Sequence, residues 1–244
     1  MSKPFTRSQI NKLGERLRSG ASDDDLRMLS EYRNSHEVAL EATIHEVEEC
    51  TRLTPVGRPK SNQSIIEKLR RQSTRLSQMQ DIAGCRLVVE GPMQQRQLLE
   101  SLLSRFPGAE VHDRRAKPSN GCRAIHLVVQ HVDGQHVEIQ LRTELQDLWA
   151  QCSERLADLH GIEVKYGGGP PEISALLTRL SEFVAEIERL QMLASPNAVA
   201  DRVREAELPA RLRCGYAMVG ESFPQLRYLL GMLPDLVVSS RQAR

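Results

Sequence analysis

The chain has 244 residues, enough for one large domain or for one domain with helical additions. Apolar residues make up 40% of it, charged residues 27% and aromatic residues only 4%, which indicates a soluble globular protein with a mainly aliphatic core. The 33 Lys and Arg residues against 32 Asp and Glu residues give a formal net charge of +1. This balance excludes a strongly basic nucleic-acid-binding arm and an acidic tail.

The sequence shows no sign of export or of membrane insertion. No apolar run approaches the roughly 20 residues that a membrane-spanning helix needs, and the N-terminus has no apolar signal core. The five cysteines are odd in number and show no metal-binding spacing: Cys50, Cys85, Cys122, Cys152 and Cys214. We therefore expect no membrane partner and a reduced, cytoplasmic setting.

The first part of the chain is expected to be helical. Helix is predicted over residues 5–50, where Ser22 and Asp25 have capping-box spacing ahead of apolar residues at helical intervals. Proline and glycine interrupt this pattern within residues 51–63. A second helix is expected over residues 64–77.

The centre of the chain changes to the short β-branched or alternating runs that are typical of strands. Asp133 and Gly134 separate the last two runs and predict a hairpin turn. An amphipathic helix is expected over residues 93–106. The four predicted strands cover residues 82–90, 109–112, 122–131 and 136–142.

The rest of the chain returns to helix from Thr143, with a Gly- and Pro-rich break at residues 167–171. Further helices are expected over residues 172–195, 198–212 and 223–233. A stripe at helical spacing in the first of these indicates core packing: Leu176, Leu180, Phe183, Ile187 and Leu190.

The predicted fold class is therefore α+β, with a small mixed sheet flanked by helices. Four strands can be placed, and a sheet of about five needs one more that the sequence does not locate. We expect N-terminal helices over residues 1–50, a core over residues 51–166 and a helical C-terminal region over residues 167–244.

Four clusters of polar residues stand beside these elements, and the first surrounds the start of the helix predicted at residue 64. Arg58 and Lys60 precede this helix, while Ser64 and Lys68 lie four residues apart on one of its faces. A helix N-terminus with a hydroxyl group and several cations is suited to polyphosphate. The alternative is an ordinary N-cap serine among solvated cations.

The second cluster is the pair Asp81 and Arg86, at the start and in the middle of the first strand. A carboxylate at a strand end can hold Mg²⁺ that bridges phosphates, and a guanidinium group can stack on a purine. The alternative is an internal ion pair.

The third cluster is the polar loop that feeds the third strand. It contains Lys117, Asn120 and Arg123 and leads to His126. Polar loops of this kind commonly bind ligands. The alternative for His126 is a half-buried strand histidine whose hydrogen bonds are satisfied.

The fourth cluster lies on the last strand, where strict alternation places Glu138, Gln140 and Arg142 on one face. Glu138 could be a second metal ligand or a general base. The alternative is the solvent face of a half-exposed strand. Together, the four clusters favour Mg²⁺-dependent chemistry on a nucleotide phosphate.

These segments also match a known family in their order and spacing. The motifs R-x-K-x3-S-x3-K, D-I-x-x-x-R, N-G-x-x-x-x-H and V-E-I-Q-L-R-T resemble those of the RelA/SpoT alarmone synthetases. The resemblance covers roughly residues 36–166 and is strongest to the small single-domain members, some of which are toxins. It implies a nucleotidyltransferase-like synthetase fold of about five strands. The first hundred residues show no HD hydrolase metal motif, so alarmone hydrolysis is not expected.

The resemblance implies a GTP diphosphokinase-like enzyme that moves the β,γ-pyrophosphate of ATP to the ribose 3′-hydroxyl of GDP or GTP, making (p)ppGpp. Asp81 would hold Mg²⁺, and Glu138 would assist the metal or activate the hydroxyl. The implied ATP-binding residues are Arg58 and Arg86, which would sandwich adenine, and Lys60, Ser64 and Lys68, which would contact phosphates. The implied acceptor-site residues are Lys117, Asn120, Cys122, Arg123, His126, Gln140 and Arg142.

One position departs from the family. Where these proteins usually have a tyrosine that stacks on the acceptor base, this chain has Cys122. Base–aromatic stacking contributes about 1–3 kcal/mol in single-strand binders. Its loss would lower acceptor affinity roughly ten- to hundredfold unless another residue stacks.

Two other functions remain open. One is a toxin, with an antitoxin partner, that makes (p)ppApp or pyrophosphorylates the 3′-end of tRNA; the other is a catalytically silent domain that binds a nucleotide or a partner protein. The C-terminal helices would also suit a homo-oligomer interface. Contact with tRNA needs a basic surface, for which the candidates are Arg70, Arg71, Arg75, Arg114, Arg115 and Lys117.

Overall fold

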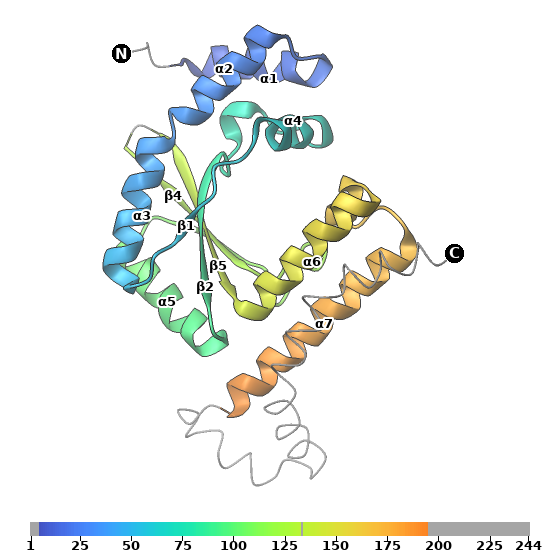
Figure 1. The fold of residues 1–244 in the computed structure, drawn as a ribbon. Coiled ribbons are helices and arrows are strands. Elements are labelled where there is room, and N and C mark those ends of the chain that lie inside the picture. The colour runs from blue at the N-terminus through green and yellow to red at the C-terminus, as the bar shows by residue number, and fades with distance from the viewer. Residues whose placement is uncertain (1–4, 133, 195–244) are drawn as a thin grey trace. The chain divides into compact units, whose positions relative to one another are not determined.

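The computed structural model describes residues 5–132 and 134–194, and it confirms the α+β fold (Figure 1). Five strands form one sheet in the order β1-β2-β5-β4-β3. The strands are β1 (Val56–Gly57), β2 (Ala83–Val89), β3 (Glu110–Asp113), β4 (Ile125–Gln130) and β5 (His136–Thr143). The α-helices are α1 (Arg7–Ser19), α2 (Asp23–Asn34), α3 (Glu37–Thr51), α4 (Asn62–Arg71), α5 (Pro92–Arg105), α6 (Glu144–His160) and α7 (Pro171–Ala194).

The described residues divide into two compact units. The first contains the residues up to Leu87 together with Leu98–His112 and His126–Leu141. The second contains Val88–Gln97, Asp113–Ile125 and the described residues from Arg142 onward.

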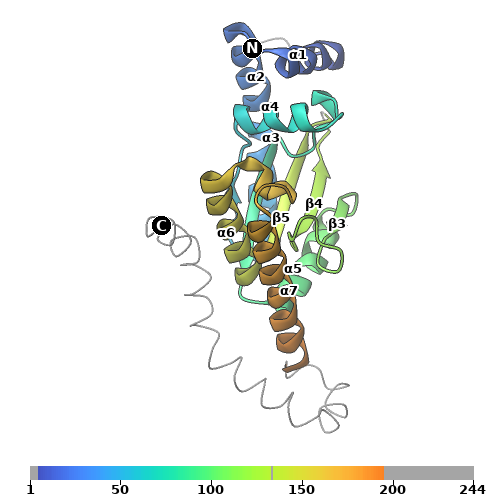
Figure 2. The ribbon, with the colours of Figure 1, turned by 90° about the vertical axis from the view of Figure 1, so that its right-hand side faces the viewer.

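Helices α1, α2 and α4 pack side by side in the first unit, as Figures 1 and 2 both show. Their shared core includes Leu13, Leu17, Leu29 and Ile65, all fully buried. The capping box of Ser22 and Asp25 is confirmed at the start of α2. The helix predicted over residues 64–77 is shorter than expected, because α4 ends at Arg71 and a separate 3-10 turn covers Leu76–Gln78.

Strand β1 is the fifth strand that the sequence did not locate. It consists of two residues and pairs antiparallel with β2, with Val56 opposite Arg86 and Gly57 opposite Cys85. Proline stands on both sides, at positions 55 and 59, and proline removes a backbone donor from a sheet. A pairing segment this short leaves no periodic signal in the sequence.

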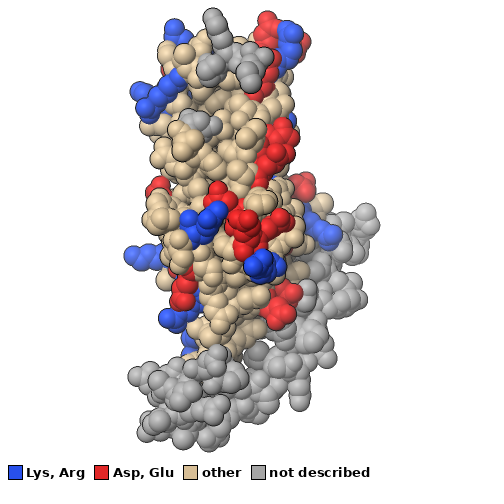
Figure 3. Space-filling view, turned by 90° about the vertical axis from the view of Figure 1, so that its left-hand side faces the viewer, with Lys and Arg blue, Asp and Glu red and all other residues tan. Residues whose placement is uncertain are grey.

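Helix α3 packs beside β1, where the Ile44 side chain lies 3.4 Å from a Cβ atom built on Gly57. Thr43 also hydrogen-bonds His131 at 2.8 Å. On this side of the molecule, acidic and basic side chains are interspersed (Figure 3). Arg105 of α5 lies 3.2 Å from Glu46 and 3.7 Å from Glu49 of α3.

The predicted hairpin joins β4 to β5. The His131 amide donates to the Gln135 carbonyl at 2.8 Å, and Gly134 has φ +82°, a conformation that favours glycine. Strand β4 starts at Ile125, so the prediction of strand from residue 122 was wrong. The segment before Ile125 forms a tight turn instead.

Helices α6 and α7 form the core of the second unit. Thr143 and Gln146 make a capping box at the start of α6, and the Trp149 indole donates to the Leu177 carbonyl at 2.8 Å. The predicted α7 stripe was wrong in part: Phe183 is 46% exposed, and Leu176 is only half-buried. The buried stripe consists of Ile173, Leu177, Val184, Ile187 and Leu190.

The predicted helices over residues 198–212 and 223–233 lie outside the described residues, as does the end of the helix predicted to reach residue 195. Among the described helices, none combines the length and the hydropathy that a membrane crossing requires.

Candidate functional site

The centre of the site is Asp81, which lies two residues before β2. Its carboxylate pairs with two lysine side chains. Lys60 Nζ is 2.9 Å from one carboxylate oxygen, and Lys68 Nζ is 2.8 Å from the other. All three side chains are only about one-quarter exposed or less. Burial raises the pKa of Asp81, but the charges of Lys60 and Lys68 outweigh it and hold the pKa below its usual value. The carboxylate is therefore ionised at neutral pH.

Backbone pairing along β2 positions the first of these lysines. The Arg58 amide donates to the Gly84 carbonyl at 2.6 Å, and the Lys60 amide donates to the Ile82 carbonyl at 2.9 Å. The chain after β1 thus stays beside the start of β2, past the proline at position 59. This local pairing brings Lys60 to Asp81, 21 residues later in the sequence.

Helix α4 brings the second lysine. The N-cap of this helix is Ser61, whose hydroxyl accepts the Ser64 amide and donates to the Ser64 hydroxyl at 2.9 Å. Ser64 is therefore in the first turn and is not the cap, and Lys68 lies one turn further on. The helix places a hydroxyl and a lysine on one face, as the sequence predicted.

Glu138 is held by two side chains on the central strands. Its Oε1 accepts His126 Nδ1 at 2.7 Å, and its Oε2 accepts Gln140 Nε2 at 2.7 Å. Burial raises the pKa of Glu138, but the hydrogen bond and charge of His126, with Gln140 and Lys60, lower it to about 2. Because Lys60 lowers the pKa of both carboxylates, it links the two halves of this group.

Gly84 lets β2 and β5 approach each other beneath these side chains. A Cβ atom on Gly84 would lie 2.7 Å from the Glu138 carbonyl oxygen. Arg58, opposite Gly84, reaches across to Gln140, with its NH1 3.4 Å from the amide oxygen. Arg86 lies on β2 two residues after Gly84, so its side chain is on the same face of the sheet as that of Arg58. Arg58 and Arg86 are thus diagonal neighbours, at a typical separation of about 7–8 Å.

Gly84→Ala should lower the melting temperature, because the new methyl group would force the Glu138 backbone away from β2. Overpacking of this kind typically costs about 1–3 kcal/mol. The matched control is Gly108→Ala, since a Cβ atom on Gly108 meets nothing within 4 Å. Equal melting temperatures for the two variants, measured by circular dichroism, would contradict the close approach.

The predicted acceptor loop is a tight turn in the second unit. Ser119 and Cys122 exchange backbone hydrogen bonds of 3.2 and 2.9 Å, and Asn120 and Gly121 between them have φ +50° and +87°. Positive φ at both central residues is the signature of a type I′ turn. The turn packs tightly, because a Cβ atom on Gly121 would lie 2.4 Å from the Trp149 ring.

The structure gives several predicted acceptor residues an internal partner. Arg123 donates to the Ser181 hydroxyl at 2.8 Å and to the Arg115 carbonyl at 2.6 Å. Arg142 is buried, and its NH1 lies 3.1 Å from Asp147 Oδ1. Cys122 packs against the hydrophobic cluster around Trp149, and Lys117 and Asn120 are exposed.

The predicted residues therefore fall into two groups. Most of those in the first unit form a connected network through Lys60, Glu138 and Gln140; its other members are Arg58, Lys68, Asp81 and His126. Those of the Asn120 turn, with Arg142, belong to the second unit.

A buried polar network in the second unit was not predicted from the sequence. Glu188 accepts the Thr143 hydroxyl and the Gln146 amide, and Gln146 in turn accepts the Gln95 amide at 2.9 Å. Burial raises the pKa of Glu188. The capping-box spacing of Thr143 and Gln146 was visible in the sequence, whereas the partner on α7 was not.

The described side chains form no cluster of three or more His, Cys, Asp and Glu residues that could hold a metal ion. Asp81 and Glu138 offer ionised oxygen ligands instead. Magnesium is usually bound by one or two carboxylates together with substrate phosphates and water. The donor set therefore fits Mg²⁺ that is shared with a phosphate ligand, and it does not fit a metal cage made by protein alone.

Sequence comparison places the chain among known proteins. The profile of a family described as "Region found in RelA / SpoT proteins" matches residues 57–159. "Uncharacterized protein Rv1366" of Mycobacterium tuberculosis is 31% identical over 222 residues, covering 85% of this chain and 80% of that protein. "Uncharacterized protein Mb1401" of Mycobacterium bovis gives the same values.

Solved structures share the fold. Small alarmone synthetase 1 of Bacillus subtilis is 27% identical, with a TM-score of 0.53 over 75% of this chain and 100% of that chain. The same synthetase bound to its product pppGpp is 24% identical, with a TM-score of 0.57 over 68% and 95%. Small alarmone synthetase 2 of Bacillus subtilis is 20% identical, with a TM-score of 0.54 over 67% and 95%. The sheet and its flanking helices therefore have the fold of these proteins.

Proposed function

This chain belongs to the RelA/SpoT family, and from that membership we propose that it transfers the β,γ-pyrophosphate of ATP to the ribose 3′-hydroxyl of a nucleotide acceptor. The acceptor oxygen bonds to the β-phosphorus, the bond between the α- and β-phosphates breaks, AMP leaves, and the hydroxyl proton is released. GDP or GTP is the proposed acceptor, which would make the product (p)ppGpp. The observation that carries the proposal is the ionised Asp81 between Lys60 and Lys68, linked through Lys60 to Glu138.

The cations around Asp81 suit the ATP phosphates. Lys60 and Lys68 come from two different elements and converge on one point, with the Ser64 hydroxyl one helical turn from Lys68. Arg58 and Arg86 on neighbouring strands have about the spacing that a ring between two planes needs, because each stacking contact takes about 3.5 Å. We assign adenine to this arginine pair and the phosphates to the two lysines and Ser64.

Asp81 and Glu138 would hold Mg²⁺ together with the ATP phosphates. The ion would supply charge neutralisation to the phosphates. Lys60 and Lys68 neutralise the charge of Asp81. When ATP binds, both lysines have a second anion, the polyphosphate, within their reach.

The low pKa of Glu138 favours a charge-stabilising role over that of a general base. An effective general base has a pKa near the working pH, and about 2 is far below it. Glu138 accepts His126 Nδ1–H and thereby fixes the orientation of the imidazole ring. Glu138 would thus act as a fixed negative charge that positions both His126 and the metal.

One labelling experiment tests the function. Purified protein is incubated with ATP labelled at the γ-phosphate and with Mg²⁺, in parallel with GDP, GTP, ADP or bulk tRNA, and the label is followed by thin-layer and gel separation. Label in GDP or GTP is the expected result. Label only in ADP or only in tRNA would replace the proposed acceptor and favour the toxin alternative. Label in no acceptor, with ATP still bound, would favour the silent binding domain.

Lys60→Gln should raise the KM for ATP about ten- to hundredfold, since a hydrogen bond to a charged group contributes about 1.5–3 kcal/mol. It should also raise the pKa of Asp81, because one of the two charges that lower it is removed. Activity should then fail at a higher pH than in the wild type as the solution is acidified. Steady-state rates at neutral pH measure the first effect, and rates followed down toward pH 3.8, the ordinary pKa of an aspartate, measure the second. Lys12→Gln, at an exposed position on α1, is the control.

A further inference from the structure

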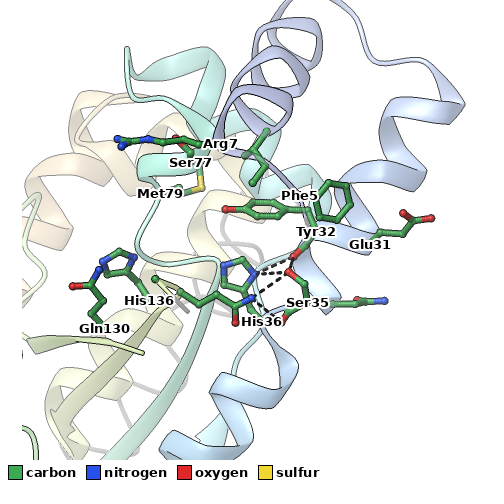
Figure 4. A pocket seen from close by; sticks show the side chains of 14 residues that line it. Phe5, Arg7, Glu31, Tyr32, Ser35, His36, Ser77, Met79, Gln130 and His136 are labelled. Atoms are coloured by element: carbon green, nitrogen blue, oxygen red, sulfur yellow. Dashed lines mark hydrogen bonds between the residues drawn. The ribbon is translucent and has the colours of Figure 1, made fainter. Parts of the chain in front are cut away.

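The first unit, which holds Asp81 and Glu138, also contains a cavity of about 910 Å³, within the range of about 300–1,000 Å³ that is usual for ligand pockets (Figure 4). We call it the Tyr32 pocket. Its walls come from the start of α1, the end of α2, the segment before β2 and the β4–β5 hairpin. Its lining includes Phe5, Tyr32, His36, Met79, Gln130 and His136.

Two residues that line the Tyr32 pocket are close in sequence to the two carboxylates of the site. Met79 lies two residues before Asp81, and His136 lies two residues before Glu138. Residues two apart on a strand point to the same face and are about 7 Å apart. His136 therefore shares a sheet face with Glu138 and Gln140. A molecule in the pocket would extend along this face toward the reacting groups.

The walls of the pocket are aromatic and preorganised. The rings of Phe5 and Tyr32 meet edge to face at 5.9 Å, and those of Tyr32 and His36 at 5.0 Å. His36 Nδ1 hydrogen-bonds the Tyr32 carbonyl at 2.9 Å, which fixes the ring. Burial raises the pKa of Tyr32 to about 12, so its hydroxyl stays neutral.

The charge of the lining does not suit phosphate. Apart from histidines, one cation, Arg7, and one anion, Glu31, line the pocket. The side-chain amides of Asn34, Gln130 and Gln135 also line it, and amides read the donor and acceptor edges of bases. The lining thus matches a neutral heteroaromatic ring that carries hydrogen-bonding groups.

The geometry points to the Tyr32 pocket as the subsite for the nucleobase of the acceptor, which would replace the stacking platform that Cys122 cannot provide. Cys122 packs against the Trp149 cluster and offers no aromatic ring. The inference rests on the proposed function, because it takes the group near Glu138 to be the acceptor ribose. The base would belong either to a free nucleotide or to the 3′-end of an RNA.

Two variants of the full chain test the subsite. His136→Ala removes a lining ring, and Gln130→Trp fills the cavity from an exposed position. The matched controls are His112→Ala and Val111→Trp on β3, both at exposed positions outside the lining. Affinities are measured by calorimetry for GDP, for ADP, for a short RNA ending in CCA, and for an ATP analogue with a methylene bridge between its α- and β-phosphates.

The expected result is a loss of about tenfold in affinity for at least one acceptor in both variants, with the ATP analogue and both controls unchanged. The acceptor whose affinity falls identifies the source of the base. Unchanged acceptor affinities, an equal loss for the ATP analogue, or no acceptor binding by the wild type would each overturn the subsite.

A third variant distinguishes the Tyr32 pocket from the Asn120 turn as the place where the base binds. Cys122→Tyr should leave acceptor affinity unchanged if the base lies in the Tyr32 pocket, and a tenfold gain would place the base at the Asn120 turn instead. All these measurements record binding affinity, so they do not depend on whether the protein transfers pyrophosphate. A wild type that binds as expected but transfers no label would refute the proposed function alone, and active variants with wild-type affinities would refute the subsite alone.

Discussion

Asp81→Asn should reduce pyrophosphate transfer by about a thousandfold or more, because it removes the negative charge that we assign to metal binding while keeping the size of the side chain. Lys60 and Lys68 would remain, so ATP should still bind. Initial rates with labelled ATP measure the loss. Binding of the methylene-bridged ATP analogue shows that the donor site is still formed.

Asp113→Asn is the matched control for this variant. Asp113 also pairs with a cation, Arg115 at 2.6 Å, but it is not part of the Lys60 and Lys68 group. We expect wild-type rates in this control. An Asp81→Asn protein that is folded and fully active would refute the metal assignment.

Glu138→Gln should lower transfer by about a hundred- to thousandfold, the usual effect of removing one positioned electrostatic group. The amide would keep the shape but lose the charge that orients His126 and attracts the metal. Rates from labelled ATP measure this effect. Glu110→Gln on β3 is the control, because Glu110 is exposed and contacts only Gln80 and His112 in the hydrogen bonds and ion pairs described for it.

Comparison of the wild type with Glu138→Gln also tests the low pKa of Glu138. A carboxyl group whose pKa falls from 4.5 to about 2 on folding stabilises the fold above pH 4.5, and this contribution disappears as the pH falls toward 2. The melting temperature of the wild type should therefore exceed that of Glu138→Gln most clearly near neutral pH. The difference should shrink between pH 4.5 and pH 2. A difference that does not depend on pH would mean that Glu138 is not held as an ion.

The sequence predicted those parts of the fold that have a strong period. Strands β2 and β5 and helix α5 begin and end within two residues of their predicted bounds, and α6 begins one residue after the predicted start at Thr143. The strict alternation of β5 was enough to place Glu138 beside Gln140. Strand β1 could not be found in this way, because its two residues are defined only by pairing with β2.

The residues of the candidate site were predictable from the sequence, but the contacts between them were not. The sequence singled out Lys60, Lys68 and Asp81, yet the convergence of both lysines on one carboxylate depends on how α4 packs beside β2. The pairing of His126 with Glu138 likewise depends on the register of the hairpin. Phe5 and Tyr32 of the Tyr32 pocket carried no signal, since they lie far in sequence from the motifs.

The α7 stripe failed for a related reason. Several phases of a long apolar helix satisfy helical spacing, and the buried phase is selected by the partner. Here α6 selects Leu177 and Val184, and Phe183 turns outward. Sequence spacing alone does not contain that information.

The Asn120 turn is fastened to helices α6 and α7 before any ligand arrives. The Ser181 hydroxyl donates to the Gly121 carbonyl at 2.7 Å and accepts from Arg123, while Trp149 closes the other side. Fixing the backbone of one residue costs about 1–2 kcal/mol in conformational entropy, and the turn has already met that cost during folding. A change at Ser181 would undo this fixation, so the order of the turn depends on a residue of α7 that belongs to no sequence motif.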